Sequence, residues 1–128
     1  MQQTPDDLLT RATLVAVEKF NQAFNRQDLD AVMALMTADC LFENTYPAPD
    51  GTSFKGQEAV RQAFADFFAS SPNMHFETEE IFAAGERAVM RWIYRWHNQH
   101  DGSGHVRGVD IFWVQEGKIA EKLSYVKG

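Results

Sequence analysis

The first seventy residues place apolar side chains at the spacing of amphipathic helices. In the first predicted helix the inward positions, three and four residues apart, are Leu9, Thr13, Ala16, Phe20, Ala23 and Phe24. Pro5 suits the first turn of this helix, and Asp28 is a favourable cap for a short second helix. Gly56 is expected to open a third helix, which ends before Pro72.

After Pro72 the apolar pattern alternates, which is typical of strands. One short strand is predicted earlier, at 40–44, and four more are predicted at 74–83, 87–97, 105–115 and 118–126. Their connections are short or contain glycine, so consecutive strands are expected to pair antiparallel. Helices followed by such strands predict an α+β fold of one domain, residues 1–128, with the helices on one face of a curved sheet.

The charge and the cysteine content exclude several classes of protein. Twelve basic and eighteen acidic residues give a net charge of −6, which argues against nucleic acid or an anionic membrane as a partner. The single cysteine, Cys40, excludes an internal disulfide. No segment has the composition of a membrane span or a signal peptide, so a cytoplasmic protein is expected.

Two groups of residues resemble a phosphate-binding loop and a metal site, but their spacing matches neither. Gly102-Ser103-Gly104 precedes a predicted strand and lacks the glycine spacing of a phosphate-binding loop. Polar side chains around the same connection match no known pattern of metal ligands and are interpreted as a solvated turn; they are His97, His100, Asp101 and His105. No metal or cofactor is therefore expected.

Five segments in a fixed order carry a resemblance to a known superfamily. They are Phe24–Asp30, Ala38–Asn44, Phe54–Val60, Gly108–Phe112 and Gly117–Ile119. Over nearly the whole chain the sequence resembles the nuclear transport factor two-like superfamily, in its SnoaL-like and ketosteroid-isomerase-like branch. The resemblance implies a cone-shaped fold in which three helices close the concave face of a bent, mainly antiparallel sheet around a pocket. Members include isomerases, cyclases, dehydratases and epoxide hydrolases, so the fold leaves the function open.

The resemblance transfers only part of the known catalytic residues to this chain. Asp110 matches the sheet aspartic acid of ketosteroid isomerases, but their base falls on Asn44 and their helix tyrosine on Phe20. Neither an amide nor a phenyl ring can replace those groups, which argues against a ketosteroid isomerase. The last-strand aspartate of SnoaL-like cyclases and epoxide hydrolases falls on Ser124, and no aspartate accompanies Arg91, which argues against a limonene epoxide hydrolase.

Strand alternation then divides the sheet residues between two faces. With Asp110 pointing into the pocket as the candidate catalytic residue, the predicted binding residues are Phe20, Phe24, Asn44, Phe64, Arg91, Ile93, Phe112, Lys122 and Ser124. The opposite face would carry Trp92, Tyr94, Trp96, Ile111, Trp113, Leu123 and Tyr125. So large an aromatic surface predicts a homodimer packed sheet against sheet. A single bulge would exchange the two faces of one strand and place Trp92, Tyr94 and Trp96 inside instead.

Three functions are compatible with this pattern. The first is cofactor-free acid–base chemistry on a hydrophobic carbonyl or cyclic substrate. Asp110 would move the proton, Asn44 and Ser124 would orient the substrate, and Lys122 or Arg91 would offset negative charge. The second is a module that binds a small hydrophobic molecule without chemistry, with Asp110 and Lys122 as a structural charge pair. The third is a protein-interaction adaptor.

Overall fold

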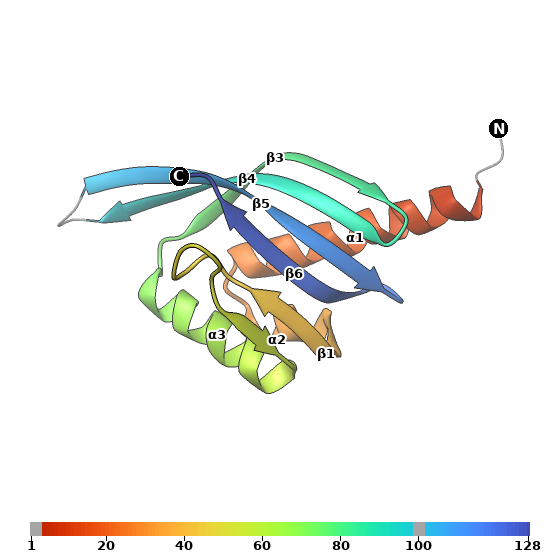
Figure 1. The fold of residues 1–128 in the computed structure, drawn as a ribbon, viewed down its shortest axis with the longest axis horizontal. Helices are drawn as coiled ribbons and strands as arrows, with labels where there is room; N and C mark the ends of the chain where they lie inside the picture. Colours follow the sequence, from red (N-terminus) through yellow and green to blue (C-terminus); the bar gives the residue numbers. More distant parts are fainter. Residues whose placement is uncertain (1–3, 99–101) are drawn as a thin grey trace.

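The computed structural model describes residues 4–98 and 102–128, which form three helices and six strands (Figure 1). These are α1 (Pro5–Asn25), α2 (Leu29–Ala34), β1 (Met36–Glu43), β2 (Ser53–Lys55), α3 (Gln57–Ser70), β3 (His75–Ala84), β4 (Arg87–Asn98), β5 (Gly102–Gln115) and β6 (Lys118–Val126). The three helices and five of the strands confirm the predicted order. The strand β2 lies in a segment that the sequence pattern indicated only as a loop.

The six strands form one curved sheet in the order β2-β1-β6-β5-β4-β3. The strands β1 and β6 pair parallel, and all other neighbours pair antiparallel. Figure 1 shows α1 running along one face of this sheet, with α3 on the same side against β1. The paired ends of β4 and β5 project past the helices. The α+β cone-shaped fold is therefore confirmed, and the helix-covered side is called the inner face below.

Local interactions explain where the helices begin. The Thr4 hydroxyl accepts a hydrogen bond from the backbone N–H of Asp7, whose carboxylate accepts one from the backbone N–H of Thr4. This capping box, with Pro5 in the first turn, fixes the start of α1. The Asp28 carboxylate caps α2 by accepting from the N–H of Ala31.

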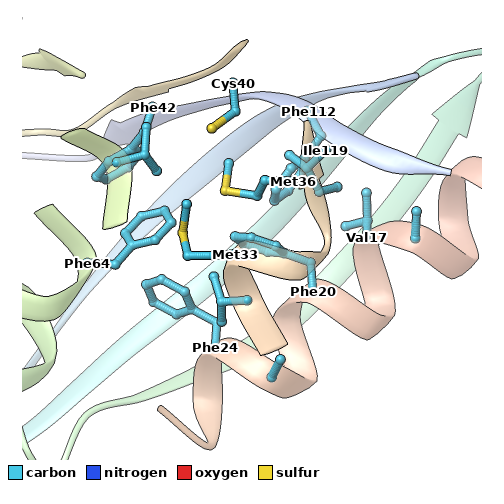
Figure 2. Close-up of a cluster of buried hydrophobic side chains, with 14 of the residues drawn as sticks. Val17, Phe20, Phe24, Met33, Met36, Cys40, Phe42, Phe64, Phe112 and Ile119 are labelled. Atoms are coloured by element: carbon cyan, nitrogen blue, oxygen red, sulfur yellow. The ribbon is translucent and has the colours of Figure 1, made fainter. Parts of the chain in front are cut away.

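The hydrophobic core lies between the helices and the inner face of the sheet (Figure 2). Phe20 of α1, Phe64 of α3 and Phe112 of β5 are fully buried and pack in edge contacts, with ring centroids about 6 Å apart. Each such ring stabilises the fold by roughly 1.5–3 kcal/mol through burial alone. The same cluster continues as the wall of a cavity.

The pairing of β4 with β5 decides which residues of β4 face the core. Met90 pairs with Asp110 and Trp92 pairs with Gly108. Directly paired residues of antiparallel strands point to the same face, so Met90 and Trp92 share the inner face with Asp110. Glycine at 108 makes this packing possible, because a Cβ there would lie 2.4 Å from the Trp92 ring. Gly104 gives Trp96 room in the same way.

The prediction that Arg91 and Ile93 face the pocket is wrong. Both alternate with the inward Trp92, and Arg91 forms an ion pair with Glu80 at 2.9 Å on the outer face of the sheet. The alternative register, with the tryptophans inside, is the correct one. The physical reason is that the face of each β4 residue follows from the register of β4 against β5, and a shift of one residue in that register exchanges the two faces.

The outer face carries ion pairs as well as apolar side chains. Four arginine–glutamate pairs lie across it: Arg87–Glu121, Arg91–Glu80, Arg95–Glu77 and Arg107–Glu79. Of the aromatic face predicted for a homodimer, Trp92, Tyr94 and Trp96 lie inside instead. The residues that remain outside are Ile111, Trp113, Leu123 and Tyr125. The homodimer itself stays a prediction.

Candidate functional site

A cavity of about 250 Å³ lies between the helices and the inner face of the sheet. Its lining comes from α1, α3, the loop after β1 and five strands. The lining residues are Phe24, Phe42, Asn44, Thr45, Tyr46, Ala63, Phe67, Phe76, Trp92, Asp110, Lys122 and Ser124. Aromatic rings dominate this wall, the charged groups lie on β5 and β6, and Asn44 and Thr45 of the loop add polar groups at the edge. The cavity thus combines a largely apolar space with one buried polar cluster, which is the usual composition of a small-molecule site.

The polar cluster is a buried ion pair with a hydroxyl beside it. Lys122 Nζ lies 3.2 Å from Asp110 Oδ2, and the two side chains are only 9% and 3% exposed. The same ammonium donates a hydrogen bond to Ser124 Oγ at 3.0 Å. It also lies 4.9 Å from the ring centroid of Phe42 and 5.5 Å from that of Phe24. The ion pair and the two rings together stabilise the buried cation.

Two buried polar atoms of residues that line the cavity lack partners among the described residues. Asp110 Oδ1 and the indole nitrogen of Trp92 are both buried without a hydrogen bond. Leaving a buried polar group unpaired costs about 1–3 kcal/mol, and more for a charged one. Such groups are therefore expected to serve a bound molecule. Of the two atoms, the carboxylate oxygen bears more directly on chemistry, since it can accept a hydrogen bond or a proton.

The structure brings most of the predicted site residues together. Phe24, Asn44, Asp110, Lys122 and Ser124 line the main cavity. Phe20 and Phe112 line a much smaller cavity next to it, together with Asp110 and Lys122. Phe64 is fully buried behind the wall and packs on the rings of Phe24 and Phe42. Their roles in binding and catalysis remain predictions, whereas Arg91 and Ile93 lie on the other face.

Asn44 contributes to the cavity mainly by shaping its edge. Its Oδ1 accepts hydrogen bonds from the backbone N–H groups of Tyr46 and Thr52, at 3.2 and 2.7 Å. The backbone N–H of Asn44 donates to the carbonyl of Thr52, and Gly51 packs tightly against the Asn44 carbonyl at a positive φ of 72°. These contacts fold the loop back on itself and hold Tyr46 at the cavity edge.

Several lining residues were not predicted as site residues. Tyr46 comes from the loop, and Ala63 and Phe67 from α3. Phe76 lies on β3, where its ring packs on Trp92 and Tyr94 with centroids about 5 Å apart. One pattern in the sequence could have placed Trp92 correctly. Two tryptophans four residues apart on β4 face two glycines four residues apart on β5, and small residues opposite large rings indicate a shared face.

Other candidate chemistry lies outside this site. No group of three or more histidine, cysteine or acidic side chains in the described residues could hold a metal ion. Of the polar cluster near the β4–β5 connection, His100 and Asp101 fall outside the described residues. Burial raises the pKa of the Cys40 thiol, which makes it a poor nucleophile. No helix in the described part of the chain is long and apolar enough to cross a membrane.

Comparison with known families identifies the fold family. Residues 17–122 match the family model of the SnoaL-like domain. The chain belongs to the SnoaL-like family. No curated protein gives a significant match to this SnoaL-like chain. Because the match includes β1 to β5 and most of the cavity lining, the family and the cavity belong to the same part of the chain.

Solved structures place the SnoaL-like chain in the wider nuclear transport factor two-like superfamily. A protein of unknown function from Mesorhizobium loti, described as of that fold, is 39% identical over 100% of both chains, with a TM-score of 0.81. A ketosteroid-isomerase-like protein from Catenulispora acidiphila, in complex with trimethylamine, is 18% identical over 86% of this chain and 83% of its own, with a TM-score of 0.76. A putative polyketide cyclase from Sinorhizobium meliloti is 18% identical over 87% and 94%, with a TM-score of 0.73. The last two show the fold alone.

Proposed function

We propose that this SnoaL-like protein catalyses cofactor-free proton transfer on a hydrophobic, cyclic substrate that carries a carbonyl group. One observation carries the proposal. A buried carboxylate, Asp110, has one oxygen paired with Lys122 and the other without a partner, at a cavity walled by aromatic rings. A carboxylate in this setting is a candidate general base, because its second oxygen has no other hydrogen-bond partner among the described residues and can accept a proton.

The cavity favours a flat, compact ligand. A volume of about 250 Å³ admits one or two fused rings. The rings of Phe24, Phe67 and Phe76 provide apolar and stacking contacts for such a ligand. The charged groups lie on β5 and β6, so the ligand would place its carbonyl towards Lys122 and Ser124. The proposed substrate is therefore a cyclic ketone or a related compound with an acidic hydrogen beside the carbonyl.

The proposed step transfers one proton and forms an enolate. Asp110 Oδ1 takes a proton from the carbon next to the carbonyl, the C–H electron pair forms a carbon–carbon double bond, and the carbonyl π pair moves to the oxygen to give an enolate. The Lys122 ammonium and the Ser124 hydroxyl, which lie 3.0 Å from each other, stabilise the negative charge on the enolate oxygen. Asp110 then delivers a proton, either the same one or one exchanged from solvent, to the same carbon or to another one, which regenerates the carboxylate.

Deuterium exchange of a simple ketone tests this step without knowledge of the natural substrate. The probe is 2-tetralone, a bicyclic ketone with acidic hydrogens, incubated with the protein in D₂O and followed by NMR. The protein is expected to accelerate incorporation above the buffer rate. Asp110→Asn is expected to lower the rate by about 100-fold or more, the typical contribution of one general base. An unchanged rate in Asp110→Asn would refute the catalytic role.

A matched control and a binding measurement separate catalysis from binding. Glu80→Gln makes the same carboxylate-to-amide change on the outer face, where Glu80 pairs with Arg91, and should leave exchange unchanged. Titration of tryptophan fluorescence with 2-tetralone reports binding, since Trp92 lines the cavity.

The second candidate function is a non-catalytic binding module. The Asp110–Lys122 pair favours it, because the cation already balances the carboxylate without any chemistry. Saturable quenching of the fluorescence by 2-tetralone, with no exchange above the buffer rate, would support this function over the catalytic one.

A further inference from the structure

A second, much smaller cavity lies behind the main one. It measures about 10 Å³ and shares Phe24, Phe76, Asp110 and Lys122 with the wall of the main cavity. Its remaining lining residues are Phe20, Asn21, Met90 and Phe112. A space of about 10–15 Å³ on this measure is what one water molecule requires. The cavity is thus large enough for a single water and too small for any organic ligand.

The polar groups around this inner cavity suit a water molecule. Asp110 Oδ1 is an orphaned acceptor, Lys122 supplies ammonium donors, and Asn21 supplies an amide. Buried waters typically make two to four hydrogen bonds to groups of this kind. A water donating to Asp110 Oδ1 would remove the cost of leaving that oxygen unpaired. Burial, size and polarity therefore all indicate the same occupant.

On its other side the inner cavity adjoins a groove on the protein surface. This groove, about 230 Å³, runs between α1 and β3 and β4 and is lined by Glu18, Asn21, Gln22, Thr78, Ile81 and Met90. Asn21 and Met90 line both spaces. The Asn21 amide donates to the Thr78 hydroxyl at 3.3 Å, and that hydroxyl lies 3.6 Å from the Met90 sulfur. Asn21 and Met90 thus form the boundary that the inner cavity shares with the groove.

We propose that the inner cavity binds one water molecule against Asp110 Oδ1, and that this water exchanges with solvent through the α1–β3 groove. The site is distinct from the main cavity, whose exposed edge carries Thr45 and Tyr46. Where the proposed function holds, the water gives Asp110 a second route for protons. The proton taken from a ligand passes from the Asp110 carboxyl to the water, and a solvent proton returns by the same path while the ligand fills the main cavity.

Oxygen-17 relaxation dispersion, which counts long-lived buried waters in solution, tests the site without any ligand or turnover. The wild-type protein is compared with Asn21→Leu, which removes the amide and fills the space. The control is Gln22→Leu, which makes an equivalent change in the groove and leaves the inner cavity untouched. We expect Asn21→Leu to lose one long-lived water that Gln22→Leu retains. Equal amplitudes in the wild type and Asn21→Leu would overturn the proposal.

A second variant covers the case in which Asn21→Leu does not fold, as judged by circular dichroism. Met90→Phe fills the inner cavity from β4 without removing a polar group, and it should lose the same water. Retention of that water in Met90→Phe would place it elsewhere and overturn the proposal.

Saturation of the wild type with 2-tetralone then tests the route. The water should persist and keep exchanging. A water that stops exchanging when the ligand fills the main cavity would place its route through that cavity and refute the groove. In Asn21→Leu, deuterium incorporation into 2-tetralone should fall while the affinity for it stays unchanged, because the abstracted proton returns to the substrate instead of exchanging. If 2-tetralone fails to bind, the proposed function loses its support, whereas the ligand-free comparison still decides the water site.

Discussion

Both faces of the sheet carry ion pairs, but the surroundings of these pairs differ. On the inner face, Asp110 and Lys122 form an ion pair that is almost fully buried at the main cavity. On the outer face, Arg91 and Glu80 form an ion pair of similar length whose side chains are each about half exposed. Water screens the outer pair, whereas the inner pair is held by protein groups and aromatic rings. Burial, more than residue type, therefore decides which carboxylate is a candidate for chemistry.

Neighbouring residues of one strand show the same contrast. Trp92 packs on Phe76 in the cavity wall, while Arg91, one position earlier, lies in the ion-pair layer outside. The inner face gains stability from packing, and the outer face remains compatible with water or with another protein surface. The following substitutions test this difference in matched pairs.

Removing a phenylalanine should have the largest effect, and only on the inner face. Phe64 is fully buried, whereas Phe82 is 53% exposed on the outer face. Phe64→Ala should lower the free energy of unfolding by about 3–5 kcal/mol through lost burial and a cavity. Phe82→Ala should change it by less than about 1 kcal/mol. Urea denaturation followed by circular dichroism measures both, and similar losses would contradict the assignment of the faces.

Breaking an ion pair should give the second largest effect. Lys122→Met leaves the buried Asp110 charge without its cation and should lower the free energy of unfolding by about 3 kcal/mol. Arg91→Met breaks the exposed pair and should cost less than about 1 kcal/mol. Addition of Asp110→Asn to Lys122→Met should restore part of the loss. A double variant no more stable than Lys122→Met would show that the cation acts by packing alone.

A methyl group at Gly108 should have an intermediate effect. The new Cβ would lie 2.4 Å from both the Trp92 ring and the Tyr125 carbonyl oxygen. Gly108→Ala should therefore displace the ring and cost about 1–3 kcal/mol, as overpacking usually does. A smaller ring relieves one of the two contacts, so Trp92→Phe should reduce the cost of Gly108→Ala. Four unfolding free energies, for the two single variants, the double variant and the wild type, decide whether the two positions are coupled.

The Cys40 thiol should give the smallest effect. Because burial raises its pKa, the folded protein holds the thiol proton at a pH at which the unfolded chain releases it. The free energy of unfolding should consequently fall slightly as pH rises above the ordinary thiol pKa. Cys40→Ala should remove this part of the pH dependence. A parallel slope in the variant and the wild type, compared between pH 8 and pH 10, would show that other groups cause the fall.

The sequence predicted the elements well because their signals are local. The spacing of Phe20 and Phe24 gave the first helix, Asp28 gave the start of the second, and Gly56 gave the start of the third. The family resemblance placed Asp110, Lys122 and Ser124 on one face, and the pairing of β5 with β6 has them there. Residues 53–55 were missed as a strand, because three residues are too few to show an alternating pattern.

The face of β4 could not be read from the sequence. Alternation separates Arg91 and Ile93 from Trp92 but does not say which set faces the helices, since that depends on the register of β4 against β5. The wrong choice placed Arg91 and Ile93 in the predicted site and took Trp92, Tyr94 and Trp96 off the inner face.

The sequence by itself therefore determined the order of the helices and of the longer strands, because helix and strand periods depend on neighbours along the chain, and its resemblance to a known superfamily indicated the fold family. Only the tertiary structure decided the cavity. Tyr46, Phe67, Phe76 and Trp92 come from a loop, a helix and two strands, and they meet only through long-range packing. The orphaned oxygen of Asp110 was likewise invisible in the sequence, because a missing partner depends on everything that surrounds the group.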